Sequence, residues 1–231
     1  VVFDNMQILL NLYKACAEIC PEARIVNPIS NCSYPGASDI QAESEWWDGE
    51  IHASVLSYGS TRRMIYVISE CYRKQYDIQS VNFIFPNTFG PGDHADPNKV
   101  HALNGMIIRM IETKRRAEKE FEIWGTGSPV REWAYVDDVA KLMISGLDTD
   151  HELTDPVNMG QNQGYTIKQS AEFIAEAVQF DGDLVFNTQY ADGAPQKILH
   201  DGKFRELFPD FAFFNHKEGI RETVKYYESV L

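Results

Sequence analysis

The sequence has few basic residues, few cysteines and no long apolar run. Its 231 residues carry 21 Lys and Arg against 34 Asp and Glu, which gives a formal net charge of −13. This balance argues against a nucleic-acid partner, because the neutralisation of phosphates requires a basic face. No apolar stretch approaches the roughly 20 residues that span a bilayer, so we expect no membrane partner.

The four cysteines, Cys16, Cys20, Cys32 and Cys71, do not form a metal-binding pattern. No Cys-x-x-Cys pair or Cys/His cluster accompanies them, and we therefore predict no metal site. A disulfide scaffold is not expected in a chain that is long enough to bury a full core. The opening residues also lack the charge order of a signal peptide. Together these absences favour a cytoplasmic protein.

The composition that remains is typical of a folded protein, since 44% of the residues are hydrophobic and 12% are aromatic. Apolar periodicity and turn residues predict alternating helices and strands. Helices are expected at 3–19, 55–76, 100–118, 136–147 and 167–178, and strands at 24–30, 80–85, 121–124, 156–159 and 183–186. This alternation predicts an α/β fold with a mainly parallel sheet, and the apolar strand at 80–85 is typical of a sheet covered on both faces.

Six short segments carry candidate chemistry, and their order and spacing are more specific than any one of them. They are Ser30–Pro35, Ala42–Glu45, Tyr58–Met64, Asn87–Asp93, Trp124–Glu132 and Asp192–Lys197. In this order they resemble the extended short-chain dehydrogenases/reductases of the NAD-dependent epimerase/dehydratase family, which act on nucleotide sugars. The chain is most similar to the GDP-L-fucose synthase group, whose members epimerise and then reduce GDP-4-keto-6-deoxymannose. The resemblance covers nearly the whole chain.

For the reduction of a 4-keto sugar, the resemblance implies roles for Ser30, Tyr58 and Arg62. Tyr58 matches the family's proton donor, a phenol with an ordinary pKa of about 10 that a fixed cation brings toward working pH. Ser30 matches the hydroxyl that bonds the same substrate oxygen, although alone it would indicate a strand-end hydroxyl bonded to loop backbone. Arg62 stands where the family has Lys. It keeps the charge, but its planar fork cannot reproduce an ammonium bonded to the nicotinamide ribose.

For epimerisation beside the ketone, the resemblance implies Cys32 and His101 as the acid and base. A thiol and an imidazole have ordinary pKa values of about 8.5 and about 6.5, so both exchange protons near neutral pH. Either residue alone would be interpreted as a small buried filler or a helix-start polar group. The pair in register with the other motifs favours catalysis, and plain 4-epimerases and 4,6-dehydratases lack it.

Binding residues follow from the same resemblance. Arg109, Arg131 and, more weakly, Lys197 match the cations that hold the substrate diphosphate, a role that suits the bidentate guanidinium. The cofactor-facing residues are Tyr58, Arg62 and the segment Phe85, Pro86, Asn87 and Thr88, which resembles the strand end along the nicotinamide. The expected substrate is a nucleotide-diphosphate sugar, with a GDP-sugar favoured.

A Gly-x-x-Gly-x-x-Gly turn after a strand, the usual cradle for dinucleotide phosphates, does not occur in the sequence. We therefore expect an NADP or NAD enzyme whose adenosine-phosphate site lies outside this chain, and a chain that lacks roughly 60–90 residues of the family fold. The expected fold is a partial Rossmann-like parallel sheet flanked by helices, with a smaller C-terminal α/β substrate-binding part. Residues 1–95, joined in part by 121–147, would form the Rossmann-like part, and 96–120 with 148–231 the substrate-binding part.

The resemblance also implies a homodimer, in which the helix at 3–19 and the helix of Tyr58 pack against their copies as a four-helix bundle. Two alternatives to the epimerase/reductase stay open. One is a nucleotide-sugar 4-epimerase or 4,6-dehydratase. The other is a non-catalytic nucleotide-sugar-binding subunit, which Arg62 and the missing glycine-rich turn would explain.

Overall fold

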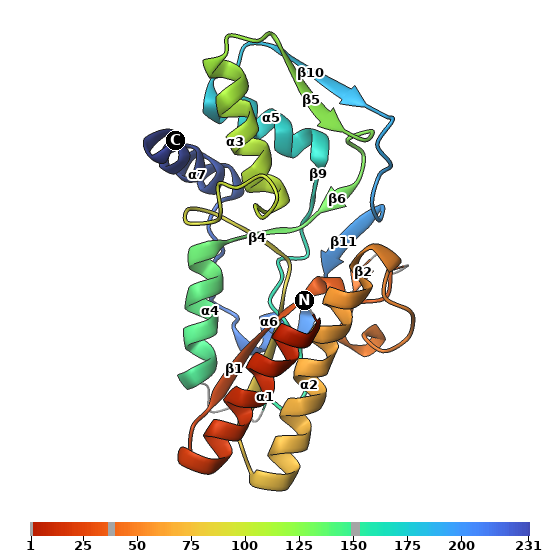
Figure 1. The fold of residues 1–231 in the computed structure, drawn as a ribbon, viewed down its shortest axis with the longest axis vertical. Helices are drawn as coiled ribbons and strands as arrows, with labels where there is room; N and C mark the ends of the chain where they lie inside the picture. The colour runs from red at the N-terminus through yellow and green to blue at the C-terminus, as the bar shows by residue number, and fades with distance from the viewer. Residues whose placement is uncertain (1, 37–39, 149–152) are drawn as a thin grey trace. The chain divides into compact units, whose positions relative to one another are not determined.

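The computed structural model describes residues 2–36, 40–148 and 153–231. The chain divides into two compact units, each assembled from three segments and coloured along the chain in Figure 1. The first unit contains Val1–Pro86, Ala140–Asn162 and Leu199–Phe211, and the second contains Asn87–Val139, Gln163–Ile198 and Ala212–Leu231. These contact-defined bounds differ from the division by role expected from the sequence, and that division stays a prediction.

The first unit is built on a parallel sheet of three strands in the order β1 (Ile25–Ser30), β3 (Ser80–Phe85) and β8 (Val157–Asn158). Two helices, α1 (Val2–Ile19) and α2 (Leu56–Tyr76), pack on one face of it (Figure 1). The apolar core between these layers includes Leu9, Tyr13, Ile25, Ile29, Ile65, Ile68 and Ile84. The α/β fold with parallel strands and flanking helices is thus confirmed.

The opposite face of this sheet is also covered, as the continuous apolar run at 80–85 indicates. Phe83 of β3 is fully buried, and its ring lies 6.3 Å from that of Phe208, which follows α6 (Gly202–Leu207). A side chain at Gly146, in α4 (Val136–Asp148), would meet the Phe83 ring at 2.7 Å. Helices therefore approach the sheet closely enough that this helical position requires glycine.

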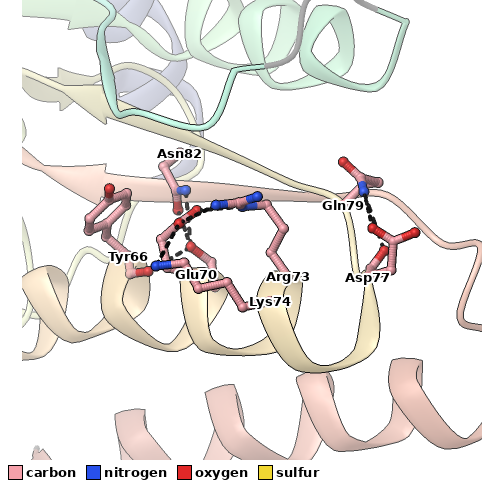
Figure 2. Close-up of polar contacts among 8 residues, drawn as sticks. Tyr66, Glu70, Arg73, Lys74, Asp77, Gln79 and Asn82 are labelled. Carbon is pink, nitrogen blue, oxygen red and sulfur yellow. Dashed lines mark hydrogen bonds and ion pairs between the residues drawn. The ribbon is translucent and has the colours of Figure 1, made fainter.

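A buried polar network crosses the core beneath α1 and α2. The Asn27 side-chain amide donates to the Tyr13 hydroxyl (2.7 Å) and to Asn82 Oδ1 (3.0 Å), and Asn82 in turn donates to Ser69 Oγ (3.1 Å). Figure 2 shows Asn82 above α2, together with the Glu70–Arg73 pair on the same helix. Buried amides favour a unique packing only when their hydrogen bonds are made, and here they are made to both helices and both strands.

The C-terminal end of α2 is closed by its own residues. Asp77 takes a left-handed conformation (φ 57°) and its backbone N–H bonds the Arg73 carbonyl. Arg73 donates twice to Glu70 and thereby lowers the pKa of that carboxyl. The Gln79 amide donates to Asp77 Oδ1 at 3.0 Å (Figure 2). The turn into β3 is thus held by a backbone bond to α2 and by a side-chain bond to Gln79.

The second unit consists of short strand pairs backed by three helices. The parallel pairs are β4 (Asn87–Phe89) with β7 (Trp133–Tyr135), β5 (Glu120–Trp124) with β10 (Asp183–Asn187), and β6 (Val130–Arg131) with β11 (Gln196–Leu199), while β9 (Tyr165–Thr166) is antiparallel to β6. The helices are α3 (Ala102–Arg115), α5 (Ile167–Val178) and α7 (His216–Val230). They share one core with the strands, centred on Ile107, Met110, Ile174, Ile220 and Tyr227.

Most element boundaries agree with the sequence-based expectations. The capping box at Thr166 is present, since its side chain accepts from the Gln169 N–H and the Gln169 side chain from that of Thr166. The helix expected to extend to 118 ends at Arg115, because Ala117 turns into a positive φ of 55°. Within the described residues, no helix has the length and the apolar character needed to cross a bilayer.

Candidate active site

In the first unit, the predicted residues Ser30 and Cys32 lie where β1 ends. Ser30 caps the short 3-10 helix η1 (Asn31–Ser33): its Oγ accepts from the Cys32 N–H at 3.2 Å, and its carbonyl accepts from Ser33 Oγ at 2.6 Å. Ser30 therefore makes the hydrogen bond to loop backbone that is expected of a hydroxyl at the end of a strand. Because that bond uses Ser30 Oγ only as an acceptor, its O–H remains able to donate to a substrate oxygen.

Tyr58 stands in the first turn of α2, and Gly59 brings that turn against η1. A Cβ built on Gly59 would collide with the Cys32 carbonyl oxygen and would lie 2.8 Å from Ile51 Cγ2. The Tyr58 side chain is 37% exposed, and its carbonyl accepts from Thr61 Oγ1 at 2.6 Å. Glycine at position 59 thus places the phenol-bearing turn beside the segment of Ser30 and Cys32.

We expect Gly59→Ala to destabilise the protein by about 2 kcal/mol, since a methyl group inserted against backbone forces the helix away from η1. Urea unfolding measures the loss. Ser57→Ala, a matched change on the exposed side of the same turn, should cost less than about 0.5 kcal/mol. Equal stabilities for the two variants would mean that the close approach of α2 to Cys32 is not required.

Arg62, four residues after Tyr58, covers the Tyr58 ring, with its guanidinium carbon 4.6 Å from the ring centroid. Its Nη2 donates to Asn5 Oδ1 of α1 at 3.0 Å. Its Nε is buried and has no hydrogen-bond partner among the described residues. The neighbouring Arg63 points elsewhere, toward the carbonyls of Ser33 and Gly49. Arg62 is therefore the cation that accompanies Tyr58, and it retains an unused donor.

In the second unit, His101 is the N-cap residue of α3, and 74% of its side chain is exposed. Its ring Nδ1 lies 3.0 Å from Asp93 Oδ2, and the same oxygen accepts from the His101 backbone N–H at 2.9 Å. Donation from His101 and His94 holds the pKa of the Asp93 carboxyl below its ordinary value, against the opposing effect of burial. His101 is thus an exposed imidazole paired with an ionised carboxylate.

Arg109, two turns after His101 in the same helix, is packed between aromatic rings. Its guanidinium carbon lies 5.1 Å from the ring centroid of Phe121 and 5.0 Å from that of Trp124, and Nη1 donates to the Glu122 carbonyl at 3.2 Å. Burial lowers the pKa of Arg109. The predicted phosphate ligand is therefore also part of the packing of α3 on β5.

Arg131 and Lys197 occupy paired positions on neighbouring strands. They are Cα partners in the parallel register of β6 and β11, so their side chains leave the same face of the sheet. Arg131 Nη1 donates to the Val130 carbonyl at 2.8 Å. Two cations side by side are favourable when an anion lies between them, which suits the predicted binding of a diphosphate.

An aromatic pair that the sequence analysis did not single out lies at the end of β5. Trp124 is 56% exposed and stacks on Tyr190, with ring centroids 5.0 Å apart and planes inclined by 25°. The adjoining Gly125–Ser128 turn is tied to Asp192, whose carboxylate accepts from the Thr126 N–H and hydroxyl. The sequence signal that could have identified this pair is a tryptophan just before a glycine-rich turn. The Trp124 ring thus contacts both Tyr190 and the Arg109 guanidinium.

The predicted nicotinamide segment runs from β3 into β4. Phe85 and Pro86 end the first unit as buried residues, while Asn87 and Thr88 begin the second and are half-buried. The Asn87 amide donates to the Glu132 carbonyl at 3.1 Å. Among the described residues, no group of three or more His, Cys, Asp or Glu side chains is arranged to hold a metal ion.

Comparison with known proteins gives consistent matches. The model of the NAD dependent epimerase/dehydratase family matches residues 1–160. The chain is 31% identical over 226 residues to a probable GDP-L-fucose synthase 1 of Oryza sativa subsp. japonica, covering 96% of this chain and 68% of that protein. It is 28% identical over 219 residues to the GDP-L-fucose synthase of Escherichia coli (strain K12), covering 89% of this chain and 67% of that protein.

Among solved structures, a GDP-L-fucose synthetase from Naegleria fowleri bound to NADP superposes with a TM-score of 0.90 at 24% identity. This match covers 99% of the chain and 75% of the Naegleria protein. A UDP-glucose 4-epimerase from Thermotoga maritima superposes with a TM-score of 0.78 at 20% identity, covering 96% of the chain and 68% of that protein. These structural matches establish the same fold.

Proposed function

Because the chain belongs to the NAD dependent epimerase/dehydratase family, we propose that it is the substrate-facing part of a nucleotide-sugar epimerase/reductase of the GDP-L-fucose synthase type. The observation that carries this proposal is the joint presence of two proton-transfer groups. Ser30, Cys32 and Tyr58 lie around η1 and the first turn of α2, and an exposed His101 is paired with Asp93. Reduction needs Ser30 and Tyr58, and epimerisation needs Cys32 and His101.

In the reduction step, Tyr58 donates a proton to the oxygen of the 4-keto group and the Ser30 hydroxyl hydrogen-bonds the same oxygen. The developing alkoxide is thereby stabilised by two donors. Arg62 lies over the Tyr58 ring, is held by Asn5, and supplies a fixed positive charge beside the phenol. These residues hold and move the proton.

The nicotinamide end of an NADP or NAD molecule fits this group. Arg62 Nε, buried and without a partner among the described residues, is a donor that a ribose oxygen would satisfy. Arg62, Tyr58 and the segment 85–88 would hold that end, and the bound cofactor supplies the hydride. We propose NADP as the cofactor, with its adenosine-phosphate site provided by residues outside this chain.

In the epimerisation step, Cys32 and His101 exchange protons with the carbon next to the ketone. One removes a proton from one side of the ring, the electron pair is delocalised onto the keto oxygen, and the other returns a proton from the opposite side. The configuration at carbon inverts and no net proton is consumed. A thiol and an imidazole suit this exchange because each can both give and accept a proton.

Solvent isotope exchange separates this proposal from its alternative, a 4-epimerase or 4,6-dehydratase. Incubation of the full-length gene product with a GDP-4-keto-6-deoxy sugar in D₂O should introduce deuterium beside the ketone. Cys32→Ser and His101→Gln should each slow this exchange by about 10²-fold or more, while Cys71→Ser, on the exposed side of α2, should not change it. Unchanged exchange in both variants would favour the alternative, whose chemistry does not use this pair.

We expect Arg131→Ala to weaken the binding of GDP by about 10- to 100-fold, because a charge-assisted contact contributes about 1.5–3 kcal/mol. Lys197→Ala should weaken it by a smaller factor. Calorimetric titration with GDP measures both effects, with Lys74→Ala, an exposed lysine of α2, as the control. Wild-type affinity in Arg131→Ala would exclude a diphosphate site on β6 and β11.

We propose that a second copy of the chain covers α1 and α2. A groove of about 190 Å³ is lined by residues of α1, α2 and β1. Its apolar side chains are Ile8, Leu9, Leu12, Val26, Pro28 and Ile65, and its polar ones are Asn5, Asn27, Thr61 and Arg62. On α1 the exposed Ile8 (70%), Leu12 (46%) and Ile19 (80%) share one helical face. Isolated apolar residues are ordinary on a surface, but a stripe beside a groove is typical of an interface.

The dimer is tested by sedimentation velocity at micromolar concentration. We expect the wild type to sediment as a dimer, and the double variant Ile8→Asp with Ile19→Asp to sediment as a monomer, because two buried carboxylates per copy would oppose association. Lys14→Glu, on the exposed side of the same helix, should remain dimeric. A monomeric wild type would remove this part of the proposal.

A non-catalytic nucleotide-sugar-binding subunit is the second candidate, and one observation favours it. Arg62 is hydrogen-bonded to Asn5 and stacked on Tyr58, and its planar fork offers the cofactor ribose a different donor geometry from that of an ammonium. This candidate predicts GDP-sugar binding without turnover, and turnover that appears with Arg62→Lys.

We further propose a cytoplasmic location, in keeping with four cysteines that form no disulfide in the part of the chain that is described.

A further inference from the structure

We propose that Asp93 is a positioning residue that fixes the proton on Nδ1 of His101, so that Nε2 is the only ring nitrogen that exchanges protons with a substrate. The assignment of Nε2 to epimerisation rests on the proposed function. The placement of the proton itself rests only on the second unit, where both residues lie.

The carboxylate of Asp93 accepts hydrogen bonds on both oxygens. Oδ1 accepts from the His94 backbone N–H at 2.8 Å. Oδ2 accepts from the His101 backbone N–H at 2.9 Å and lies 3.0 Å from His101 Nδ1. A cap on the first turn of α3 would require only the backbone contact. The additional ring contact shows that the same oxygen also orients the imidazole.

Asp93 is itself held by residues of two helices, α3 and α7. Its side chain is only 15% exposed, against 74% for His101. The Asn104 amide donates to Oδ2 at 3.2 Å, and is in turn fixed by two hydrogen bonds with the backbone of Gly90. From α7, the Tyr227 hydroxyl donates to the Asp93 carbonyl at 3.2 Å. A half-buried acceptor fixed by residues of α3 and α7 presents an exposed ring in one orientation.

The chemistry of the donor set determines the tautomer. An ionised carboxylate can only accept hydrogen bonds, and the N–H donors around Asp93 favour its ionised form. The atom that faces Oδ2 must therefore be an Nδ1–H group, whether the imidazole is neutral or charged. Nε2 then carries a lone pair in the neutral form and a proton in the charged form. It can act as base or acid without breaking the contact with Asp93.

Nitrogen-15 NMR of the wild type tests this directly. With the imidazole in its neutral form, the long-range couplings of the His101 ring should show Nδ1 protonated and Nε2 unprotonated. In Asp93→Asn, an isosteric change that removes the charge, we expect a shift toward the Nε2–H tautomer that free imidazole favours. We also expect kcat for deuterium exchange to fall by about 10²-fold, with KM changed less than about twofold.

Asp96→Asn is the matched control. Its carboxylate accepts from the Asn98 backbone N–H in the same loop and, within the described part of the chain, makes no hydrogen bond or ion pair with His101, so the His101 tautomer and kcat should stay as in the wild type. A wild-type His101 in the Nε2–H form would overturn the proposal, as would an Asp93→Asn variant that loses rate with an unchanged tautomer. An Nδ1–H tautomer without any deuterium exchange would leave the positioning role intact and contradict the proposed function instead.

Discussion

Tyr58→Phe should reduce the rate of NADPH-dependent ketone reduction by about 10³-fold while leaving substrate binding within about twofold of the wild type. The phenylalanine ring preserves the stacking surface for Arg62, which lies 4.6 Å from the ring centroid. Only the hydroxyl is removed. Because that hydroxyl is the proposed proton donor, its loss should affect the transition state and not the ground-state complex.

The control for this prediction lies on the same helix. Tyr76 is exposed at the C-terminal end of α2. The Tyr76→Phe variant should therefore catalyse ketone reduction at the wild-type rate. Stopped-flow absorbance of the reduced nicotinamide measures the rate, and calorimetry with the nucleotide sugar measures binding. If Tyr58→Phe were as fast as the wild type, the proton would have to come from another group and the roles of Ser30 and Arg62 would lose their basis.

We expect the free energy of unfolding of the wild type to fall when the pH is lowered from 7.5 to 4.5. In the His216→Phe variant this fall should be smaller by about 2.5 kcal/mol. His216 begins α7, and both of its ring nitrogens are buried without a hydrogen-bond partner among the described residues. Its ring stacks on Tyr165 at 4.5 Å and contacts Phe89 and Phe173 edge-on. Burial lowers the pKa of His216 to about 4.

The sign of the effect follows from that pKa. The unfolded chain takes up the proton near pH 6.5, its ordinary value, whereas the folded protein resists protonation until about pH 4. Stability is therefore greatest above pH 6.5 and falls as the pH drops from 6.5 toward 4. Phenylalanine fits the same aromatic surroundings and has no proton to bind, so its stability should fall less.

Urea unfolding of the wild type and of His216→Phe at pH 7.5 and 4.5 gives the double difference. An NMR titration of the wild type should place the pKa of His216 at about 4. The same pH dependence in both proteins, or a His216 that titrates near 6.5, would mean that its ring is open to water.

Local signals predicted the long elements correctly. The apolar stripe of residues 3–19, the continuous apolar run at 80–85 and the Thr166 capping box each correspond to a helix, strand or cap in the structure. These features depend on residues that are close in sequence, where periodicity and capping chemistry suffice. The α/β fold with parallel strands followed from their alternation.

The finer geometry depends on contacts between distant residues. Lys197 faces Arg131 because β11 and β6 pair in one register, and no spacing in the sequence specifies that register. Arg109 resembles a free phosphate ligand until α3 packs on β5 and places it between Phe121 and Trp124. The contact of Asp93 with His101 depends on the conformation of the loop 94–100 that joins them, which composition does not determine.

The most direct test of the central claim is the oxidation of NADPH by the full-length gene product when a GDP-4-keto-6-deoxy sugar is added, followed as the loss of absorbance of the reduced nicotinamide. We predict oxidation in proportion to the sugar added, with the 4-hydroxy product formed, and a rate that falls by about 10³-fold in Tyr58→Phe. Intact binding of the nucleotide sugar with no oxidation would contradict an epimerase/reductase and would support a binding subunit.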